Sequence, residues 1–249
     1  RDRYTDHSGP DGGWPTPEPP HRINQIYLEP ILLRHAAALP GVTLHNRTRL
    51  ADFVQDGDGV TARMVDVDRG HERHVRARYL IGCDGGSSIV RKAIGAQLEG
   101  TPVIQRVQST CIRAPGLRAL LRDKDAWCHY SVNPRRCGTV FAIDGRETWL
   151  VHNYLRDDEA DFDAVDRDWA IRTIVGSGPD FAYEVLSRED WFGRRLVADR
   201  FRDRRVFLCG DAAHLWVPFA GYGMNAGIAD AMNLSWLLAA HLRGWAPEA

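Results

Sequence analysis

The sequence has no apolar run that approaches the ~20 residues of a membrane-spanning helix, and its N-terminus is charged and proline-rich rather than signal-like. Its five cysteines are an odd, scattered set without a C-x-x-C pair, which disfavours a zinc site or a disulfide framework and favours free thiols in a reducing cytoplasm. The sequence has 32 Lys and Arg residues and 33 Asp and Glu residues, so no excess of positive charge points to nucleic acid or an anionic membrane as a partner. We expect a cytoplasmic protein of ordinary globular composition that binds no metal, nucleic acid or membrane.

Residues 205–242 contain a strand, an acidic turn, a glycine-rich loop and a helix start in succession. The apolar run 206–209 has the length and composition of a buried strand. Asp211 places a carboxylate just beyond it, where open α/β sheets bind ligands. The loop before the next helix carries Pro218, Gly221 and Gly223. Glycines allow close backbone approach and a helix start offers unpaired N–H groups, so this stretch predicts a site for a flat polar or anionic ligand. A buried structural corner is the alternative.

The same stretch resembles the GD motif of the single-component FAD-dependent aromatic hydroxylases, the group A flavoprotein monooxygenases of the para-hydroxybenzoate hydroxylase family. The match comprises Gly210-Asp211-Ala212-Ala213-His214, Pro218 and the run from Gly221 to Ile228, with Tyr222 standing where the family often has Gln. The resemblance implies that Asp211 binds a ribityl hydroxyl of FAD. It implies a catalytic position for Pro218 near the oxygen-reacting face of the flavin. Further FAD contacts are implied for Gly210, Pro218, Gly221, Gly223, Met224 and Asn225, where the helix start would stabilise the reduced flavin.

A second motif, Asp84-Gly85-Gly86-Ser87-Ser88-Ile89-Val90-Arg91-Lys92, follows another apolar run. It has the form of a strand, a turn and a helix capped by Ser87 or Ser88. It resembles the DG motif of the same hydroxylases, which implies that Asp84, Ser88 and Arg91 serve the FAD pyrophosphate and NAD(P)H. An arginine beside a helix start suits a diphosphate chemically. A plain capped helix is the alternative.

The chain before the DG motif is expected to form one helix and four strands, over 24–39 and over 42–45, 50–55, 60–66 and 74–83. Asp56-Gly57-Asp58-Gly59 is a hairpin signal between the second and third of these strands. Gln25 lies at the start of the helix, and the resemblance implies a contact with the flavin side. A solvent-exposed glutamine is the alternative for that position.

The middle of the chain predicts strands over 107–112, 127–132, 138–143 and 148–155, a helix over 162–175, and strands over 183–186 and 191–198. Partial alternation favours an antiparallel sheet with one covered face. In the family this sheet lines the aromatic-substrate pocket, which implies substrate contacts from Trp127, His129, His152 and Trp216. Core packing is the alternative for each, and the two histidines are also candidate bases for a phenol. The final helix, over 225–242, is apolar nearly all round and is expected to be buried.

These elements predict an α/β (α+β) fold, a partial Rossmann-like FAD-binding domain with an inserted antiparallel β-sheet substrate domain. The expected division is a Pro/Gly-rich arm over 1–21, an incomplete FAD-binding domain over 22–100 and 194–249, and a substrate-binding sheet over 101–193. The family's G-x-G-x-x-G unit, which binds the ADP half of FAD, is not found. We therefore expect a fragment that lacks this N-terminal unit and the C-terminal part of the family pattern. Alone, it should bind FAD weakly or not at all.

The resemblance implies an FAD-dependent, NAD(P)H-consuming monooxygenase that hydroxylates a phenolic or other aromatic substrate through a flavin C4a-hydroperoxide. FAD would be the cofactor, NADPH or NADH the electron donor, and dioxygen and a small aromatic molecule the substrates, with a homodimer left as an open option. Two alternatives stand beside this hypothesis. One is another flavin-dependent oxidoreductase on the same scaffold, and the other is a non-catalytic truncated remnant or binding module.

Overall fold

The computed structural model describes residues 21–121, 126–218 and 221–247. The chain divides into two compact units, residues 1–46 and 47–249. In the first unit the expected helix is α1 (Gln25–Ala38), with Pro30 inside it and no buried residue. The strand expected over 42–45 is wrong, because these exposed residues pair with no described strand and the first strand begins at Thr48. An apolar β-rich tetrapeptide makes a strand only where a partner lies beside it.

The second unit begins with an antiparallel meander of β1 (Thr48–Gln55), β2 (Val60–Asp66) and β3 (Glu72–Ala77). The hairpin predicted between β1 and β2 is confirmed. Asp56 closes its turn by accepting hydrogen bonds from the backbone N–H groups of Asp58 and Gly59 at 2.8 and 3.0 Å. The single strand expected over 74–83 is wrong, since the chain leaves the meander after Ala77 and enters a different sheet at Leu80.

That sheet is small, and it joins the two motif-bearing parts of the chain. Its strands are β4 (Leu80–Gly82), β10 (Arg202–Asp203) and β11 (Val206–Leu208). β4 and β11 run parallel and adjacent, so the segments that follow them leave from the same sheet edge. Helix α2 (Ile89–Ala93) follows β4, and the 3₁₀ turn η2 (Gly210–Ala212), strand β12 (His214–Leu215) and helix α5 (Gly223–Leu242) follow β11.

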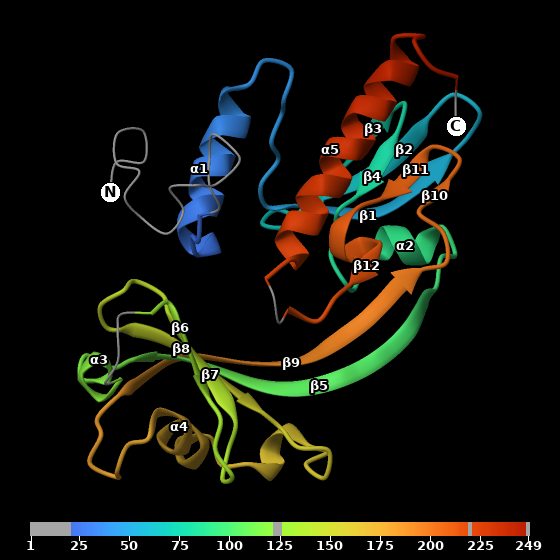
Figure 1. The fold of residues 1–249 in the computed structure, drawn as a ribbon. Helices are drawn as coiled ribbons and strands as arrows, with labels where there is room; N and C mark the ends of the chain where they lie inside the picture. Colours follow the sequence, from blue (N-terminus) through green and yellow to red (C-terminus); the bar gives the residue numbers. More distant parts are fainter. Residues whose placement is uncertain (1–20, 122–125, 219–220, 248–249) are drawn as a thin grey trace, which may run out of the picture. The chain divides into compact units, whose positions relative to one another are not determined.

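A six-stranded antiparallel sheet, ordered β12-β9-β5-β8-β7-β6, forms the rest of the unit. Its longer strands are β5 (Leu98–Arg113), β6 (Cys128–Ser131), β7 (Gly138–Ala142), β8 (Thr148–Tyr154) and β9 (Glu184–Ala198). The two strands expected over 183–198 are one continuous strand, and it pairs along the length of β5 (Figure 1). The short helix α3 (Leu117–Leu120) follows β5.

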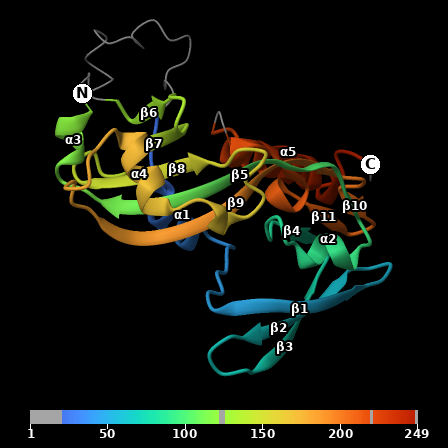
Figure 2. The same cartoon turned by 90° about the horizontal axis from the view of Figure 1, so that it is seen from below.

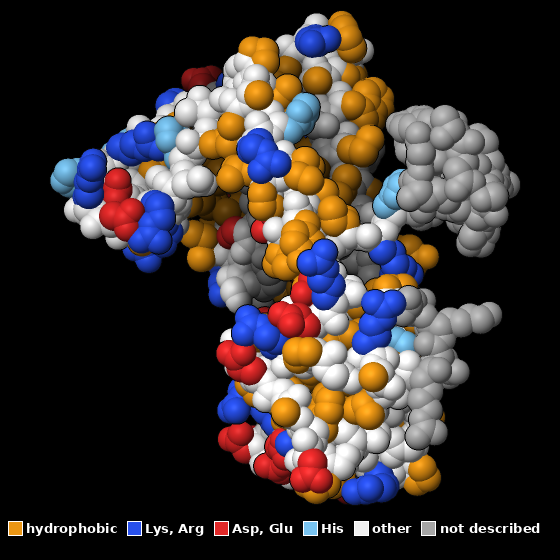
Figure 3. Space-filling model, turned by 90° about the vertical axis from the view of Figure 1, so that its left-hand side faces the viewer, with side chains coloured by type: hydrophobic (Ala, Val, Ile, Leu, Met, Phe, Trp, Pro, Cys, Tyr) orange, Lys and Arg blue, Asp and Glu red, His pale blue; other side chains and the backbone are white. Residues whose placement is uncertain are grey.

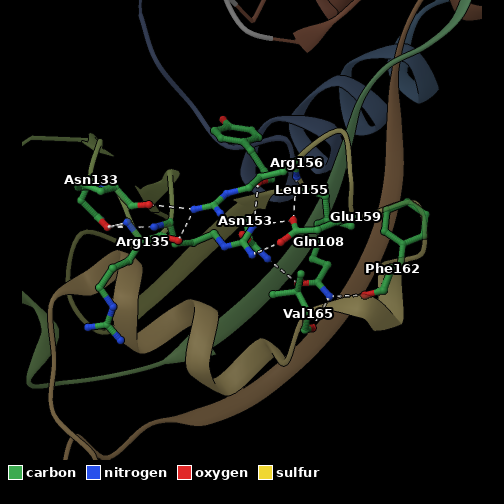
Figure 4. Close-up of polar contacts among 12 residues, drawn as sticks. Gln108, Asn133, Arg135, Asn153, Leu155, Arg156, Glu159, Phe162 and Val165 are labelled. Carbon is green, nitrogen blue, oxygen red and sulfur yellow. Dashed lines mark hydrogen bonds and ion pairs between the residues drawn. The ribbon is translucent and has the colours of Figure 1, made fainter.

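Helix α4 (Arg167–Val175) covers one face of this sheet, as both ribbon views show (Figures 1 and 2). The expected helix over 162–175 is divided, because Asp166 caps α4 and residues Phe162–Ala164 form the separate 3₁₀ turn η1. The covered face and α4 share an apolar core that includes Ile112, Val140, Trp149, Val151, Ile171 and Ile174. Buried Gln108 adds polar bonds to Asn153 and to the carbonyl of Val165 (Figure 4).

Gly138 of β7 lies where α4 meets the sheet, and replacing it with alanine should be destabilising. A Cβ there would overlap the Ile174 side chain and lie 2.5 Å from the carbonyl oxygen of His152. We expect Gly138→Ala to lower the free energy of unfolding by about 1–3 kcal/mol in urea titrations, as overpacking does. Gly57→Ala is the matched control, because a Cβ at Gly57 meets nothing within 4 Å. Equal stability of the two variants would contradict this packing.

The expected burial of the last helix is wrong, since Ala240 is its sole buried residue within the described range. The described elements give α5 one main neighbour, η2, so most of its apolar surface stays uncovered. Met232, Trp236 and Leu237 are exposed. Figure 3 shows hydrophobic side chains at the surface of one face, among charged ones. None of the helices in the described ranges combines the length and apolar character needed to cross a bilayer.

Candidate cofactor and substrate site

The DG and GD loops are joined by the side chain of Arg91. Its guanidinium donates from Nη1 to the carbonyl oxygen of Ala212 at 3.0 Å and from Nη2 to that of Gly86 at 2.7 Å. The residue is 5% exposed. Each carbonyl belongs to one motif loop, so this one buried cation holds the two loops in a fixed relation. This bridge could not be predicted from local patterns, because the carbonyl groups that Arg91 joins are far apart in the chain.

Within the DG loop, the predicted residues Asp84 and Ser88 both bind the start of α2. Asp84 Oδ1 accepts from Ser88 Oγ at 2.5 Å, and Oδ2 accepts from the N–H groups of Ile89 and Val90 at 2.8 and 3.1 Å. Ser88 Oγ accepts from the N–H of Arg91 at 2.9 Å, which makes Ser88 rather than Ser87 the cap. The structure thus brings Asp84, Ser88 and Arg91 together and gives each an internal structural task. Their contacts with FAD stay a prediction.

The GD loop is anchored to α5 through Asp230. One oxygen of this carboxylate, Oδ2, accepts from the backbone N–H of Gly210 at 2.9 Å and lies 2.7 Å from His214 Nε2. Gly210 has a φ of +58°, which suits glycine, and it lies against Gly227 of the helix. His214 is therefore bound to Asp230 and packs 5.2 Å from the ring of Trp216, which is itself exposed.

The groups left free around this loop fit FAD. Asp211 is exposed, and its carboxylate accepts no hydrogen bond from the described residues. The 20-residue helix α5 starts at Gly223 without a side-chain cap or an acidic residue in its first turn. Its first N–H groups and positive dipole end are available to an electron-rich ligand edge. FAD requires an acceptor for a ribityl hydroxyl and hydrogen-bond donors for the carbonyl edge of its flavin ring. The Asp211 carboxylate and the first N–H groups of α5 are groups of these two kinds.

The other predicted GD residues surround this helix start. Gly221 has a φ of +71°, and a Cβ at Gly221 or Gly223 would meet nothing within 4 Å, so the backbone there is open to a ligand. Exposed residues on either side are Pro218, Met224 and Asn225. Gln25 begins α1 in the separate N-terminal unit and is exposed there.

Aromatic rings and a histidine follow one another across the face of the six-stranded sheet opposite α4. Ring centroids are 5.1 Å apart for Trp127 and Phe141, 5.2 Å for Phe141 and His152, and 5.7 Å for His152 and Trp191. Opposite residues in an antiparallel pair share a face. His129 pairs with Val140, whose side chain packs against α4. His129 therefore lies on the α4 side of the sheet, away from these rings. The structure thus brings His152 toward Trp127 but not toward His129.

Burial lowers the pKa of His152 to about 4 from its ordinary 6.5, so the ring is neutral at neutral pH. The unfolded chain takes up this proton at a higher pH than the folded chain. The free energy of unfolding should therefore fall as the pH is lowered from 6.5 to 4. We expect His152→Phe to remove this part of the pH dependence, as measured by urea unfolding at the two ends of that window. An unchanged difference between the two ends would contradict a buried neutral His152.

Comparison with known proteins decides the family. The family model described as FAD binding domain matches residues 13–249. The chain belongs to that family. A putative polyketide hydroxylase of Streptomyces halstedii is 38% identical over 229 residues, covering 90% of this chain and 41% of the relative. The chain spans about two fifths of the length of the curated relatives it matches.

Solved structures agree with this FAD-binding assignment. The substrate-free rebeccamycin biosynthetic enzyme RebC is 38% identical with a TM-score of 0.81, covering 93% of this chain and 44% of that one. Aklavinone-11 hydroxylase, solved with FAD and aklavinone, is 31% identical with a TM-score of 0.81, covering 89% of this chain and 42% of that one. The predicted resemblance to FAD-dependent aromatic hydroxylases and the predicted α/β fold class are confirmed.

Proposed function

We propose that the protein is an FAD-dependent monooxygenase that hydroxylates an aromatic substrate, with NADPH or NADH as electron donor and dioxygen as co-substrate. One observation carries the proposal. Arg91 locks the two motif loops together and leaves the Asp211 carboxylate and the uncapped start of α5 free beside them. The hydroxylases and monooxygenases among the relatives support the same class of reaction.

The flavin would supply the oxygen chemistry, activating dioxygen by the C4a-hydroperoxide route that the resemblance implies. The protein's own residues would bind and orient the reactants. Asp211 would accept a hydrogen bond from a ribityl hydroxyl. The first N–H groups of α5 would donate to the electron-rich edge of the isoalloxazine ring and stabilise its negative charge after reduction. Asp84, Ser88 and Arg91 would shape the loop that receives the pyrophosphate and the nicotinamide cofactor.

The substrate would lie against the aromatic face of the six-stranded sheet. Trp127, Phe141, His152 and Trp191 present ring edges and faces there, which suits a flat apolar molecule. A phenol or a larger oxygenated aromatic is the substrate class we propose. We propose that residues 22–100 and 194–249 form the part that binds FAD and that residues 101–193 form the part that binds the substrate. A cytoplasmic location is part of the proposal, and a homodimer stays an open option.

Oxygen insertion tests this function directly. The full-length protein, FAD and NADPH or NADH would be mixed with a panel of phenols and polycyclic aromatics under isotopically labelled dioxygen. We expect substrate-stimulated oxidation of the nicotinamide and a product carrying one labelled oxygen atom. Oxidation of NAD(P)H that yields only hydrogen peroxide with every aromatic would contradict the proposal.

A further inference from the structure

His152 is held at one ring nitrogen by a chain of two hydrogen bonds. The indole Nε1 of Trp191 donates to Ser109 Oγ at 2.6 Å, and the same oxygen lies 2.6 Å from His152 Nδ1. Three neighbouring strands supply these groups, β9, β5 and β8, and Ser109 and His152 are direct partners in the sheet register. Because an indole N–H can only donate, Ser109 must act as the acceptor toward Trp191.

This chain of bonds decides which nitrogen of His152 carries the proton. Ser109 is 4% exposed, and among the described residues its hydroxyl has no acceptor other than His152 Nδ1. A buried hydroxyl that donates to nothing costs free energy, so the hydroxyl proton points at Nδ1. Nδ1 is then the acceptor, and the proton of the neutral ring is on Nε2.

The remaining donor faces a setting suited to an aromatic ligand. His152 Nε2 bonds to no described group. The rings of Phe141 and Trp191 meet the imidazole nearly edge to face, at 67° and 86°. All three side chains lie on the sheet face opposite α4, since Val151, the neighbour of His152, is in the core beneath α4. The Nε2–H group of His152 therefore lies between two aromatic rings on that face.

We propose that Nε2–H of His152 donates a hydrogen bond to a carbonyl or hydroxyl oxygen on the ring of the aromatic substrate, and so selects oxygenated polycyclic aromatics over hydrocarbons of the same shape. The inference rests on the proposed function, because it assumes that the substrate occupies this face. His152 is then a substrate-binding donor rather than a base, since the lone pair on Nδ1 is already bonded. Ser109 and Trp191 are positioning residues that fix its tautomer.

Two probes with the same three-ring skeleton, one with carbonyl oxygens and one without, test the donor. The dissociation constants of anthraquinone sulfonate and anthracene sulfonate would be measured on the FAD-loaded protein by quenching of tryptophan fluorescence. The wild-type protein should bind the quinone up to about tenfold more tightly, the effect of one hydrogen bond. His152→Phe should bring the ratio of the two constants close to one. His152→Gln, which keeps an N–H donor in place of Nε2, should preserve the preference. Ser109→Ala should reduce it in part.

A preference that survives in His152→Phe, equal affinities in the wild-type protein, or no binding of either probe would overturn the inference. Labelled-oxygen insertion into the aromatic panel is measured in parallel on the same preparations. If oxygen insertion proceeds while the ratio of the two dissociation constants is the same in the wild type and in His152→Phe, the inference fails and the proposed function stands. If insertion fails with every substrate, the proposed function fails as well.

Discussion

Replacing Arg91 with methionine should lower the free energy of unfolding by about 3–6 kcal/mol and weaken FAD binding at the same time. Hydrogen bonds from a charged donor contribute about 1.5–3 kcal/mol each, and this side chain makes two from a buried position. Methionine keeps most of the aliphatic packing but leaves the carbonyls of Gly86 and Ala212 without their partner. Because each carbonyl belongs to one motif loop, the loops also lose their fixed relation. Urea unfolding and FAD titration measure the two effects.

Lys92→Met is the matched control for this substitution. Lys92 is the next residue of the same helix, and its ammonium donates to the carbonyl oxygen of Ser87 at 3.0 Å from an exposed position. A surface substitution of this kind should change stability by less than about 0.5 kcal/mol and leave the loops joined. If Arg91→Met and Lys92→Met behave alike, the guanidinium bridge is not what holds the DG and GD loops together.

Replacing Asp211 with alanine should weaken FAD binding by about 10- to 100-fold while leaving the stability of the FAD-free protein unchanged. The carboxylate is exposed and accepts no hydrogen bond from the described residues, so its removal breaks nothing inside the chain. A charged hydrogen bond to a ribityl hydroxyl would contribute about 1.5–3 kcal/mol, which corresponds to that change in affinity. Thermal unfolding with and without added FAD separates the two effects, because ligand binding stabilises only the form that binds.

Asp158→Ala supplies the control for charge. Asp158 is an exposed aspartate in the loop after β8, outside the proposed cofactor site. Its replacement removes the same formal charge and should leave the FAD affinity unaltered. A loss of affinity shared by both variants would point to the overall charge of the protein rather than to a contact made by Asp211.

Much of the fold could be predicted from local patterns. The Asp-Gly turn predicted the β1–β2 hairpin because its geometry is set by adjacent residues. In the six-stranded sheet, β6, β7 and β8 end within one residue of their expected ranges. Strand β5 begins nine residues before the expected 107, and β9 joins two strands that were expected to be separate. The strand over 42–45 and the buried last helix were wrong for a common reason. Whether a strand pairs or a helix face is covered depends on a distant partner that the local pattern does not contain.

The candidate site divides in the same way. Asp211 and the glycine-rich helix start could be located because they follow a strand within one continuous stretch. The face on which His129 lies could not be predicted, because side chains alternate and a shift of one residue reverses the face. The roles of Ser109 and Trp191 were also missed, since residues 82 positions apart become neighbours only through the pairing of β5 with β9.

The central claim is that the two joined motif loops bind FAD through Asp211 and the start of α5. Titration of FAD into the full-length protein, followed by quenching of flavin fluorescence, tests it most directly when Asp211→Ala and Asp158→Ala are measured beside the wild type. We expect saturable binding that Asp211→Ala weakens at least about tenfold and Asp158→Ala leaves unchanged. Equal dissociation constants for all three proteins, or no binding of FAD by the wild type, would contradict it.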